Sequence, residues 1–312
     1  MSDPSDAKIV LVLRPTRLDE LVTRFNTVQQ AQFYVEHLGV DFSDYLQEHR
    51  RYHETAAEAE RILRDLGRLQ KLERRYLTNY VFGPDDNVVV LGQDGLVANT
   101  LKYLDGQRVV GVNPDPGRWD GILLPFTVED LPRVMPEEIR HKRPIKNVTM
   151  AKATLNNGQS LCAVNDLFVG QRSHVSARYK IAVGGQEEQH SSSGIIVSTG
   201  LGSTGWLKSV YAGWLAATNT LLKKKIAPVK DGSFPWDADY LQYFVREPYP
   251  SRITSSNIVI GRVSNTDPMT IVSQMPENGV IFSDGIESDY LEFNSGTRAT
   301  INVAEKHGLL VM

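Results

Sequence analysis

The sequence is poor in cysteine and contains no long apolar run. Cys162 is the only cysteine of the 312 residues, so no disulfide can form within the chain, and a reducing compartment is expected. No apolar stretch approaches the roughly 18 residues that a membrane-spanning helix needs. The first residues also lack the basic and apolar regions of a secretory signal. We therefore expect a cytoplasmic protein that does not act at a membrane.

An excess of charge of one sign is also missing. The 34 Lys and Arg residues are balanced by 37 Asp and Glu residues, which leaves a net charge of -3. This balance gives no reason to expect a nucleic acid as a partner. Hydrophobic residues make up 41% of the chain and charged residues 23%, which is typical of a globular protein rather than a disordered one. The length suggests about two domains.

Strand and helix signals alternate in the first part of the chain. Apolar runs predict strands over 8–13, 88–91 and 109–112, and helical spacing of apolar residues predicts helices over 22–38, 62–69 and 97–104. Such alternation is typical of an α/β domain with a Rossmann-like parallel sheet covered by helices. Prolines and basic residues over 132–144 then predict a linker.

The second part of the chain contains short strands separated by turns. Asn156-Asn157-Gly158 predicts a hairpin between two of them. The strands are expected at 148–155, 161–164, 179–183, 195–198, 241–245, 258–263, 269–272, 280–282, 290–293 and 299–303. This spacing predicts an all-β, antiparallel β-sandwich. We thus expect an α/β domain over 1–140 and a β-rich domain over 141–312, and leave open whether the last segment returns to the first domain.

A glycine-rich turn around one carboxylate follows the strand at 88–91. In Gly92-Gln93-Asp94-Gly95-Leu96, the glycines allow the backbone to approach a ligand closely. A carboxylate held on such a turn can act as a base or hold a metal ion. The alternative is an ordinary Asp-Gly turn that only reverses the chain.

A second glycine-rich turn, Gly200–Gly205, has the spacing G-x-G-x-x-G between a predicted strand and a predicted helix. The dinucleotide fingerprint also requires an acidic residue about 20 positions later, and no Asp or Glu occurs from Gln189 to Lys230. We therefore favour a turn that binds an anion through its amides and the hydroxyls of Ser203 and Thr204. The alternative is a simple helix cap. The nearby lysines are interpreted as a solvated face: Lys208, Lys223, Lys224, Lys225 and Lys230.

Together, these motifs resemble those of the NAD kinase family, which shares a superfamily with the diacylglycerol and sphingosine kinases. The family's Gly-Gly-Asp-Gly-Thr turn resembles Gly92–Leu96, and its Asn-Glu pair resembles Asn165-Asp166. Its Thr-Pro-Thr-Gly-Ser-Thr-Ala-Tyr stretch resembles Thr199–Trp206. Gly111-Val112-Asn113 and Asp284-Gly285 match further family elements, and the motifs are closest to the mitochondrial-type branch.

The resemblance implies ATP- and Mg²⁺-dependent phosphorylation of the 2′-hydroxyl of the adenosine ribose of NAD, which gives NADP. Asp94 is implied as the general base, and Asn165 and Asp166 as ligands of the adenosine part of NAD. The other implied nucleotide-binding residues are Gly92, Gln93, Gly95, Asn113, Thr199, Gly202, Ser203, Thr204 and Trp206. We also expect the chain to form a homo-oligomer and to act on a small molecule.

Departures from the family pattern leave two alternatives open. Gln93 and Leu96 replace glycine and threonine, Asp166 replaces glutamate, and Trp206 replaces tyrosine. The chain could be a kinase of this superfamily that acts on another nucleotide, sugar or lipid, or a catalytically silent nucleotide-binding protein. No Walker A sequence is present, which disfavours a P-loop kinase.

One further pair of residues has the spacing of helical metal ligands. His49 and His53 lie at i and i+4, but the neighbouring sequence supplies no third ligand. We therefore interpret them as part of a solvent-facing helix and nominate no metal ligand from the sequence.

Overall fold

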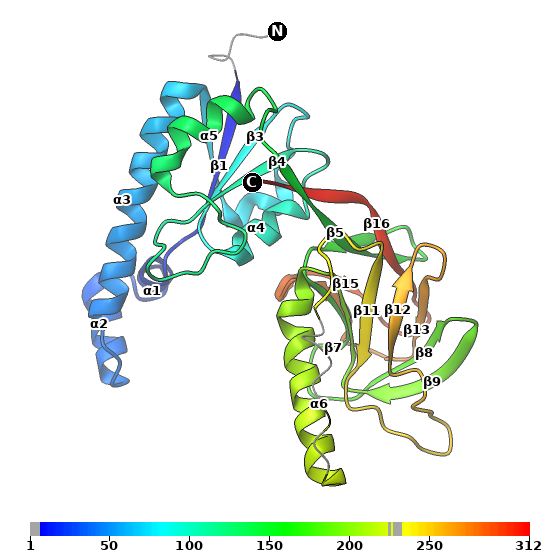
Figure 1. The fold of residues 1–312 in the computed structure, drawn as a ribbon. Helices are drawn as coiled ribbons and strands as arrows, with labels where there is room; N and C mark the ends of the chain where they lie inside the picture. The colour runs from blue at the N-terminus through cyan, green and yellow to red at the C-terminus, as the bar shows by residue number, and fades with distance from the viewer. Residues whose placement is uncertain (1–6, 224–225, 227–232) are drawn as a thin grey trace. The chain divides into compact units, whose positions relative to one another are not determined.

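The computed structural model describes residues 7–223, 226 and 233–312 and forms two compact units. Unit 1 comprises Met1–Lys146 and Leu309–Met312, and unit 2 comprises Asn147–Gly308 (Figure 1). The last residues of the chain thus return to the unit in which the chain began. None of the helices among the described residues has the length and apolarity needed to cross a membrane.

Unit 1 is built on a parallel sheet. Its strands are β1 (Lys8–Leu13), β2 (Arg68–Glu73), β3 (Asn87–Leu91) and β4 (Arg108–Val112), in the order β2-β1-β3-β4. The end of β16 (Arg298–Val311) adds a further parallel partner to β4 through Leu309 and Leu310. Ile9–Val12 and Val88–Leu91 are almost completely buried, as expected for the apolar strands of a parallel sheet covered on both faces. The predicted Rossmann-like sheet is confirmed.

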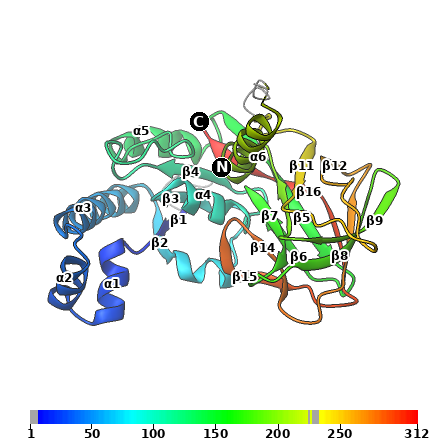
Figure 2. The ribbon, with the colours of Figure 1, turned by 90° about the horizontal axis from the view of Figure 1, so that it is seen from below.

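Helices cover this sheet on both faces. α3 (Ser43–Leu66) and α5 (Leu131–Glu138) pack with Ile9, Leu11, Val89 and Leu91 in one apolar cluster. α4 (Asp94–Leu101) contacts β3 and β4, and nearly all of its side chains are buried. α1 (Arg17–Phe25) and α2 (Val28–His37) lie beside the N-terminal part of α3, as Figures 1 and 2 both show. Two 3₁₀ helices, η2 (Arg74–Asn79) and η3 (Val128–Asp130), complete the unit.

Three expectations for unit 1 were wrong in detail. The helix predicted over 22–38 is divided between α1 and α2, because Asn26 adopts the left-handed conformation (φ 67°) and Thr27 caps α2. The helix predicted over 62–69 ends at Leu66, and Leu69 belongs to β2. The expected linker over 132–144 contains most of α5, because buried Val134 and Met135 hold this proline-containing segment against the sheet.

Unit 2 is an antiparallel β-sandwich, as predicted. One sheet has the order β12 (Ile260–Ser264), β11 (Tyr240–Val245), β10 (Ile195–Ser198), β7 (Asp166–Gln171), β14 (Gly279–Ser283) and β15 (Ile286–Glu292). The other contains β16, β13 (Met269–Ser273), β8 (Ala177–Val183) and β9 (Gln186–Ser192), with the hairpin of β5 (Ile145–Leu155) and β6 (Ser160–Ala163) paired to β16. The inward-facing side chains of both sheets form one apolar core.

In unit 2, two strands were not predicted from the sequence, and one predicted helix is present. The sequence analysis missed β7, which begins at Asp166, and the polar edge strand β9. The predicted helix after the second glycine-rich turn is α6 (Trp206–Leu222), preceded by the 3₁₀ turn η4 (Gly202–Thr204). Lys208 and Lys223 are exposed, as expected of a solvated face, whereas Lys224, Lys225 and Lys230 lie outside the described residues.

Candidate functional site

The first glycine-rich turn lies at the carboxyl end of β3 in unit 1. In the strand order, the chain moves from β1 to β2 on one side and from β3 to β4 on the other. The carboxyl ends of β1 and β3 therefore form a topological switch point, where open α/β sheets bind ligands. The amide of Gly92 donates to the carbonyl of Val112, and a Cβ on Gly92 would lie 2.9 Å from Leu96 Cδ2. Only glycine fits there without a rearrangement of Leu96.

Asp94 is the first residue of α4, and its carboxylate is held by a neighbouring loop. Oδ1 accepts a hydrogen bond from the amide of Leu123 (2.8 Å), and Oδ2 accepts one from the amide of Ile122 (3.2 Å). A carboxylate has about four acceptor positions, so each oxygen retains one for a further donor. Gln93 precedes the helix and makes no capping bond with its side chain, and Gly95 is exposed. The structure thus positions Asp94 firmly through two backbone amides.

Asn113, at the carboxyl end of β4, shapes the loop that holds Asp94. The side chain is buried; its Nδ2 donates to the carbonyl of Trp119 (2.9 Å), and its Oδ1 accepts from the amide of Asp115 (3.0 Å). These bonds order the chain between β4 and Leu123. Asn113 therefore contributes to the site through the backbone it orders.

Arg14, a partly buried cation next to this turn, was missed by sequence reasoning. Glu48 is buried and accepts hydrogen bonds from Arg14 Nη2 (2.9 Å) and Arg17 Nε. Burial opposes ionisation of Glu48, but the bonds from Arg17 and Arg14 outweigh it and lower its pKa below the ordinary value. Arg14 Nε is buried and has no hydrogen-bond partner among the described residues. Arg14 directly follows β1, and the Arg-Pro pair at that strand end was the available signal.

In unit 2, the structure brings together two of the motifs that carry the family resemblance. The hydroxyl of Thr199 donates to the carbonyl of Val164 (2.6 Å), and its amide donates to the carbonyl of Asn165 (2.9 Å). A Cβ on Gly202 would overlap the carbonyl of Asn165, so the backbone passes there at a distance that only glycine permits. The second glycine-rich turn thus packs directly on the Asn165-Asp166 turn.

Asp284 fixes the same turn from the end of β14. It adopts a left-handed conformation (φ 54°) before Gly285, and its amide donates to the carbonyl of Asp166. Its carboxylate accepts hydrogen bonds from the amides of Val164 (3.1 Å), Asn165 (2.7 Å) and Asp166 (3.2 Å). A charged acceptor for three successive amides makes the Asn165-Asp166 turn rigid.

Asp166 is the least satisfied polar group of this cluster. The residue is 9% exposed, and its Oδ1 has no hydrogen-bond partner among the described residues. Burial raises the pKa of Asp166 to about 7, against a hydrogen bond from Ser198 that lowers it; the charge of Asp284 adds to the rise. A buried carboxyl with an unused oxygen is unfavourable for folding unless a ligand supplies the missing donor.

The hydroxyls of Ser203 and Thr204, in the second glycine-rich turn, form hydrogen bonds with backbone groups of the protein. Ser203 is completely buried; its Oγ donates to the carbonyl of Gly200 (2.7 Å) and accepts from the amide of Phe234 (3.3 Å). Thr204 Oγ1 donates to the carbonyl of Leu201 (3.1 Å). Both residues close the η4 turn, so their side chains act on the shape of the turn.

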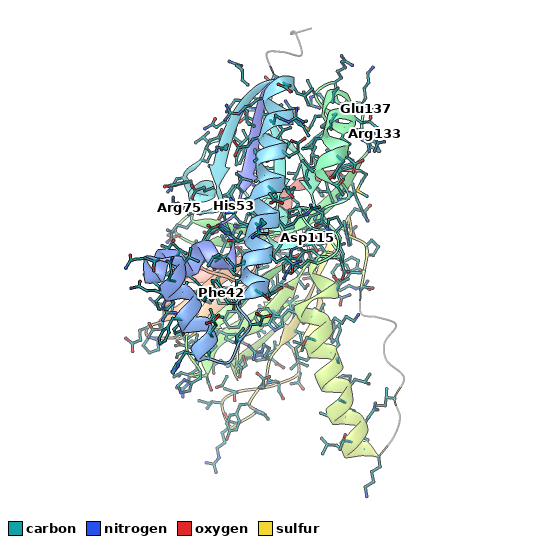
Figure 3. All side chains as sticks on the ribbon, turned by 90° about the vertical axis from the view of Figure 1, so that its left-hand side faces the viewer. Phe42, His53, Arg75, Asp115, Arg133 and Glu137 are labelled. Carbon is teal, nitrogen blue, oxygen red and sulfur yellow. The ribbon has the colours of Figure 1, made fainter. Side chains whose placement is uncertain are left out.

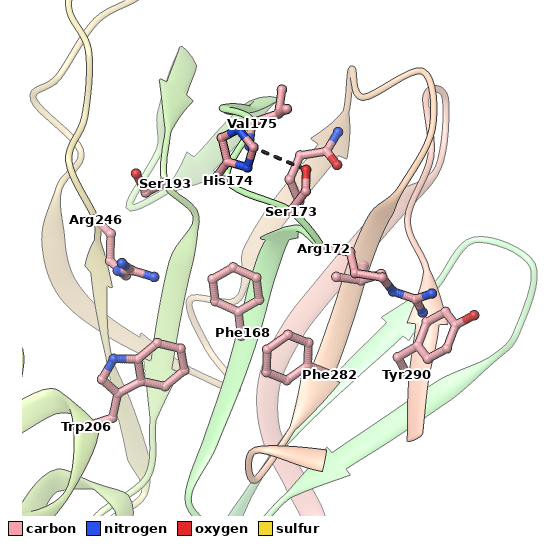
Figure 4. Close-up of a pocket in the computed structure, with 12 residues that line it drawn as sticks. Phe168, Arg172, Ser173, His174, Val175, Ser193, Trp206, Arg246, Phe282 and Tyr290 are labelled. Carbon is pink, nitrogen blue, oxygen red and sulfur yellow. Dashed lines mark hydrogen bonds between the residues drawn. The ribbon is translucent and has the colours of Figure 1, made fainter. Parts of the chain in front are cut away.

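Trp206 belongs to a cavity of about 330 Å³ on the face of the six-stranded sheet that points away from the sandwich core. Phe168 stacks on Trp206 (ring centroids 5.9 Å apart) and on Phe282 (4.8 Å). The guanidinium of Arg246 lies over the Trp206 ring, and that of Arg172 lies over the Tyr290 ring. Figure 4 shows the two phenylalanines between these Arg–aromatic pairs.

Sequence reasoning missed every member of this cavity except Trp206. Phe168, Arg172, Arg246 and Phe282 come from β7, β11 and β14 or from the residues that follow these strands. No local motif links them, because they become neighbours only when the strands pair. The outcome is a flat aromatic surface with a cation at each side, suited to a ring compound that carries negative charge.

The chain thus combines a parallel α/β unit with an antiparallel sandwich whose last strand returns to the first unit. The chain is similar to an NAD kinase from Archaeoglobus fulgidus in complex with ATP, with a TM-score of 0.54 and 14% identity over 97% of this chain and 93% of that one. It is also similar to yeast NADH kinase complexed with NADH, with a TM-score of 0.57 and 16% identity over 98% of this chain and 83% of that one.

No protein-family model and no curated protein sequence matches the chain. At these identities, the comparisons show the fold: the chain has the fold of the NAD kinases. The resemblance inferred from the motifs is therefore confirmed at the level of architecture.

Proposed function

We propose that this chain is an NAD kinase-like phosphotransferase, which transfers a phosphoryl group from ATP to the ribose 2′-hydroxyl of the adenosine part of NAD. The observation that carries the proposal is the buried Asp166 carboxyl with its unused oxygen, held on a turn that Thr199 and Asp284 make rigid. Ionisable groups perturbed by burial next to a specific charge are typical of functional sites. The two similar structures contain ATP and NADH, respectively, which supports a nucleotide as the ligand.

Each unit contributes different chemistry to the proposed reaction. In unit 1, Asp94 is assigned as the general base for the hydroxyl, and the amides of Gly92–Gly95 with Arg14 are assigned to the donor phosphates. In unit 2, Asn165 and Asp166 are assigned to the ribose and base of the adenosine part. Phosphoryl transfer needs mainly positioning and neutralisation of charge, and these groups supply both.

The residues at the Asp94 turn fit a Mg²⁺ ion that arrives with ATP. Outside the cluster of Asp19, His49 and His53 described below, the described residues contain no group of three His, Cys, Asp or Glu side chains that could hold an ion. Mg²⁺ is commonly bound by one or two carboxylates together with substrate phosphates, rather than by a protein cage. The ion would neutralise phosphate charge, and Asp94 would be the carboxylate that the turn supplies.

The aromatic cavity beside Trp206 fits one ring of the dinucleotide. Its volume of about 330 Å³ lies at the small end of the range for ligand pockets, which is enough for a base but not for a whole dinucleotide. The stacked rings of Phe168 and Trp206 offer a surface for a flat ring, and Arg172 and Arg246 match the negative charge of a nucleotide.

The direct test is incubation of the purified chain with ATP, Mg²⁺ and NAD or NADH, followed by measurement of NADP or NADPH. Calorimetry of NAD binding without ATP tests the Asp166 assignment. Asp166→Asn should weaken binding by about 10- to 100-fold, because the substitution replaces one carboxylate oxygen, a hydrogen-bond acceptor, with an NH₂ group that only donates. Asp237→Asn is the matched control in the same unit, since Asp237 is exposed. Equal binding by wild type and Asp166→Asn would contradict the assignment.

A catalytically silent nucleotide-binding protein is the second candidate. The observation in its favour is that both oxygens of Asp94 already accept backbone amides, while Leu96 occupies the space beside Gly92. NAD binding without any transfer from γ-labelled ATP, to NAD or to a panel of nucleosides, sugars and diacylglycerol, would favour this candidate. Label in one of the other acceptors alone would instead identify a kinase of the same superfamily with a different substrate.

A further inference from the structure

A second cluster of ligand-type side chains lies in unit 1, on helices α1 and α3. His49 and His53 are one turn apart on α3, and Asp19 approaches them from α1. The three side chains place one ligand atom each within 4.8 Å of the others. His53, which Figure 3 labels, has its Nε2 3.1 Å from Asp19 Oδ2, and His49 Nδ1 lies 3.5 Å from Asp19 Oδ1. Asp19 is thus the third ligand that the sequence around the histidines does not contain.

These distances are close to those between the ligands of a tetrahedral zinc ion. With Zn–N and Zn–O bonds of about 2.0–2.2 Å, two ligand atoms of a tetrahedron lie about 3.3 Å apart. His49 Nδ1 lies 3.5 Å from Asp19 Oδ1, and His53 Nε2 lies 3.1 Å from the other carboxylate oxygen, Oδ2. The three side chains can each offer a ligand atom within 4.8 Å of the other two.

Asp19 is held in a fixed orientation by the start of α1. Its Oδ2 accepts hydrogen bonds from the amide and the hydroxyl of Thr16 (both 2.8 Å), in the capping box of α1. Oδ1 is outside the capping box and can coordinate an ion.

His49 Nδ1 already has a partner, the hydroxyl of Thr16 at 2.9 Å, which an ion would replace. The ring centroids of His49 and His53 are 4.3 Å apart, so both rings border the same space beside Asp19. A divalent cation in that space would be coordinated by both rings and the carboxylate. Nitrogen ligands favour Zn²⁺ over Mg²⁺, which prefers oxygen.

We propose that Asp19, His49 and His53 form a zinc site, with water in the fourth position, that links α1 to α3. The site is independent of the phosphotransferase proposed above. The α1–α2 pair is attached to the start of α3 through a small apolar cluster of Leu18, Ala31, Val35 and Phe42. A metal link between α1 and α3 stabilises this attachment, whose apolar contacts are few.

The test uses the full-length chain without an affinity tag, stripped with a chelator and then titrated with ZnCl₂ in a calorimeter. One ion per chain is expected, and Co²⁺ should give the strong visible absorption of a tetrahedral site. His49→Ala and His53→Ala should each weaken zinc binding by about 100-fold or more, which exceeds the loss from removing an outer-shell partner. His37→Ala, an exposed histidine of α2, should bind as wild type does.

Two further variants separate coordination from helix capping. Asp19→Asn removes both the ligand and part of the capping box, whereas Thr16→Ala removes the cap and keeps the ligand. Zinc should raise the melting temperature of wild type and Thr16→Ala, but not that of Asp19→Asn or His53→Ala. Binding that is absent, differs from one ion per chain, or survives in both histidine variants would overturn the proposal and leave an ion-pair cluster.

Discussion

Asp94 in unit 1 and Asp166 in unit 2 are both aspartates at turns beside buried strands, and the two units treat them in opposite ways. The carboxylate of Asp94 is half-buried and receives a backbone amide on each oxygen. The carboxyl of Asp166 is buried, with one oxygen unused and its pKa raised to about 7. The fold supplies hydrogen-bond donors to both oxygens of the first group, whereas one oxygen of the second has no donor among the described residues.

This difference separates two ways in which a protein prepares a reactive side chain. Backbone amides orient Asp94 without a cost in unsatisfied polar groups, so the residue is ready for a proton transfer in a defined geometry. The unpartnered oxygen of Asp166 is unfavourable for folding, and in the proposed function a bound nucleotide would remove that penalty. Such a trade of stability for function is common at binding sites. The predictions below test this contrast, from the largest expected effect to the smallest.

The largest effect is expected from Asp94→Asn on the formation of NADP. Loss of a general base should reduce kcat by about 10²- to 10⁴-fold. The affinity for NAD, measured by calorimetry, should change little, because the assigned NAD ligands lie in unit 2. Wild-type turnover in this variant would show that Asp94 is only a structural acceptor for the loop at Ile122-Leu123.

Gly202→Ala and Gly95→Ala form a matched pair, one in each glycine-rich turn. A Cβ on Gly202 overlaps the Asn165 carbonyl, so we expect a loss of about 3 kcal/mol or more in the free energy of unfolding. A Cβ on Gly95 meets none of the described atoms within 4 Å, and alanine in α4 should stabilise by about 0.5–1 kcal/mol. Urea unfolding measures both. A similar loss at the two positions would contradict the different packing of the turns.

Asp284→Ala should destabilise unit 2 by about 2–3 kcal/mol, because three backbone amides lose their charged acceptor. Asp267→Ala is the control, since the Asp267 carboxylate accepts one backbone amide among the described residues, that of Gly184, and the loss of this bond should cost about 1 kcal/mol. Chemical denaturation of both variants gives the comparison. The Asp284 variant should also bind NAD more weakly, whereas the Asp267 variant should not.

The smallest effect is the pH dependence of stability that Asp166 contributes. Its folded pKa of about 7 lies above the ordinary value of 3.8, so between these pH values the folded chain holds a proton that the unfolded chain has released. Stability should therefore fall as the pH rises from about 4 to about 7, and this contribution should be constant above pH 7. Asp166→Asn should remove it and stabilise the chain by about 1–2 kcal/mol at pH 8.

Glu138 in unit 1 serves as the reference for this measurement. Burial raises its pKa to about 7, against the opposing charges of Arg108 and Arg143. Glu138→Gln should flatten the same pH range without any effect on NAD binding. If Asp166→Asn leaves the pH profile of unfolding unchanged while Glu138→Gln alters it, the Asp166 carboxyl is better solvated than its burial indicates.

Elements set by residues close together in the sequence could be predicted, whereas elements set by packing between distant residues could not. The buried runs at Ile9–Val12 and Val88–Leu91 predict their strands, because continuous β-branched residues are typical of a parallel sheet. The turn at Asn157-Gly158 predicts its hairpin for a similarly local reason. The break at Asn26 and the helix α5 were missed, because a left-handed residue and a proline-containing helix are selected by packing rather than by propensity.

The sequence by itself determined most of the strands, the class of each unit and the two glycine-rich turns that resemble those of the NAD kinases. These features depend on residues close together in the chain. Only the tertiary structure decided which groups are satisfied: the amides on Asp94, the unused oxygen of Asp166 and the approach of Asp19 to the two histidines. The physical reason is that hydrogen bonding and burial depend on partners brought together by strand pairing and helix packing, which the local sequence does not specify.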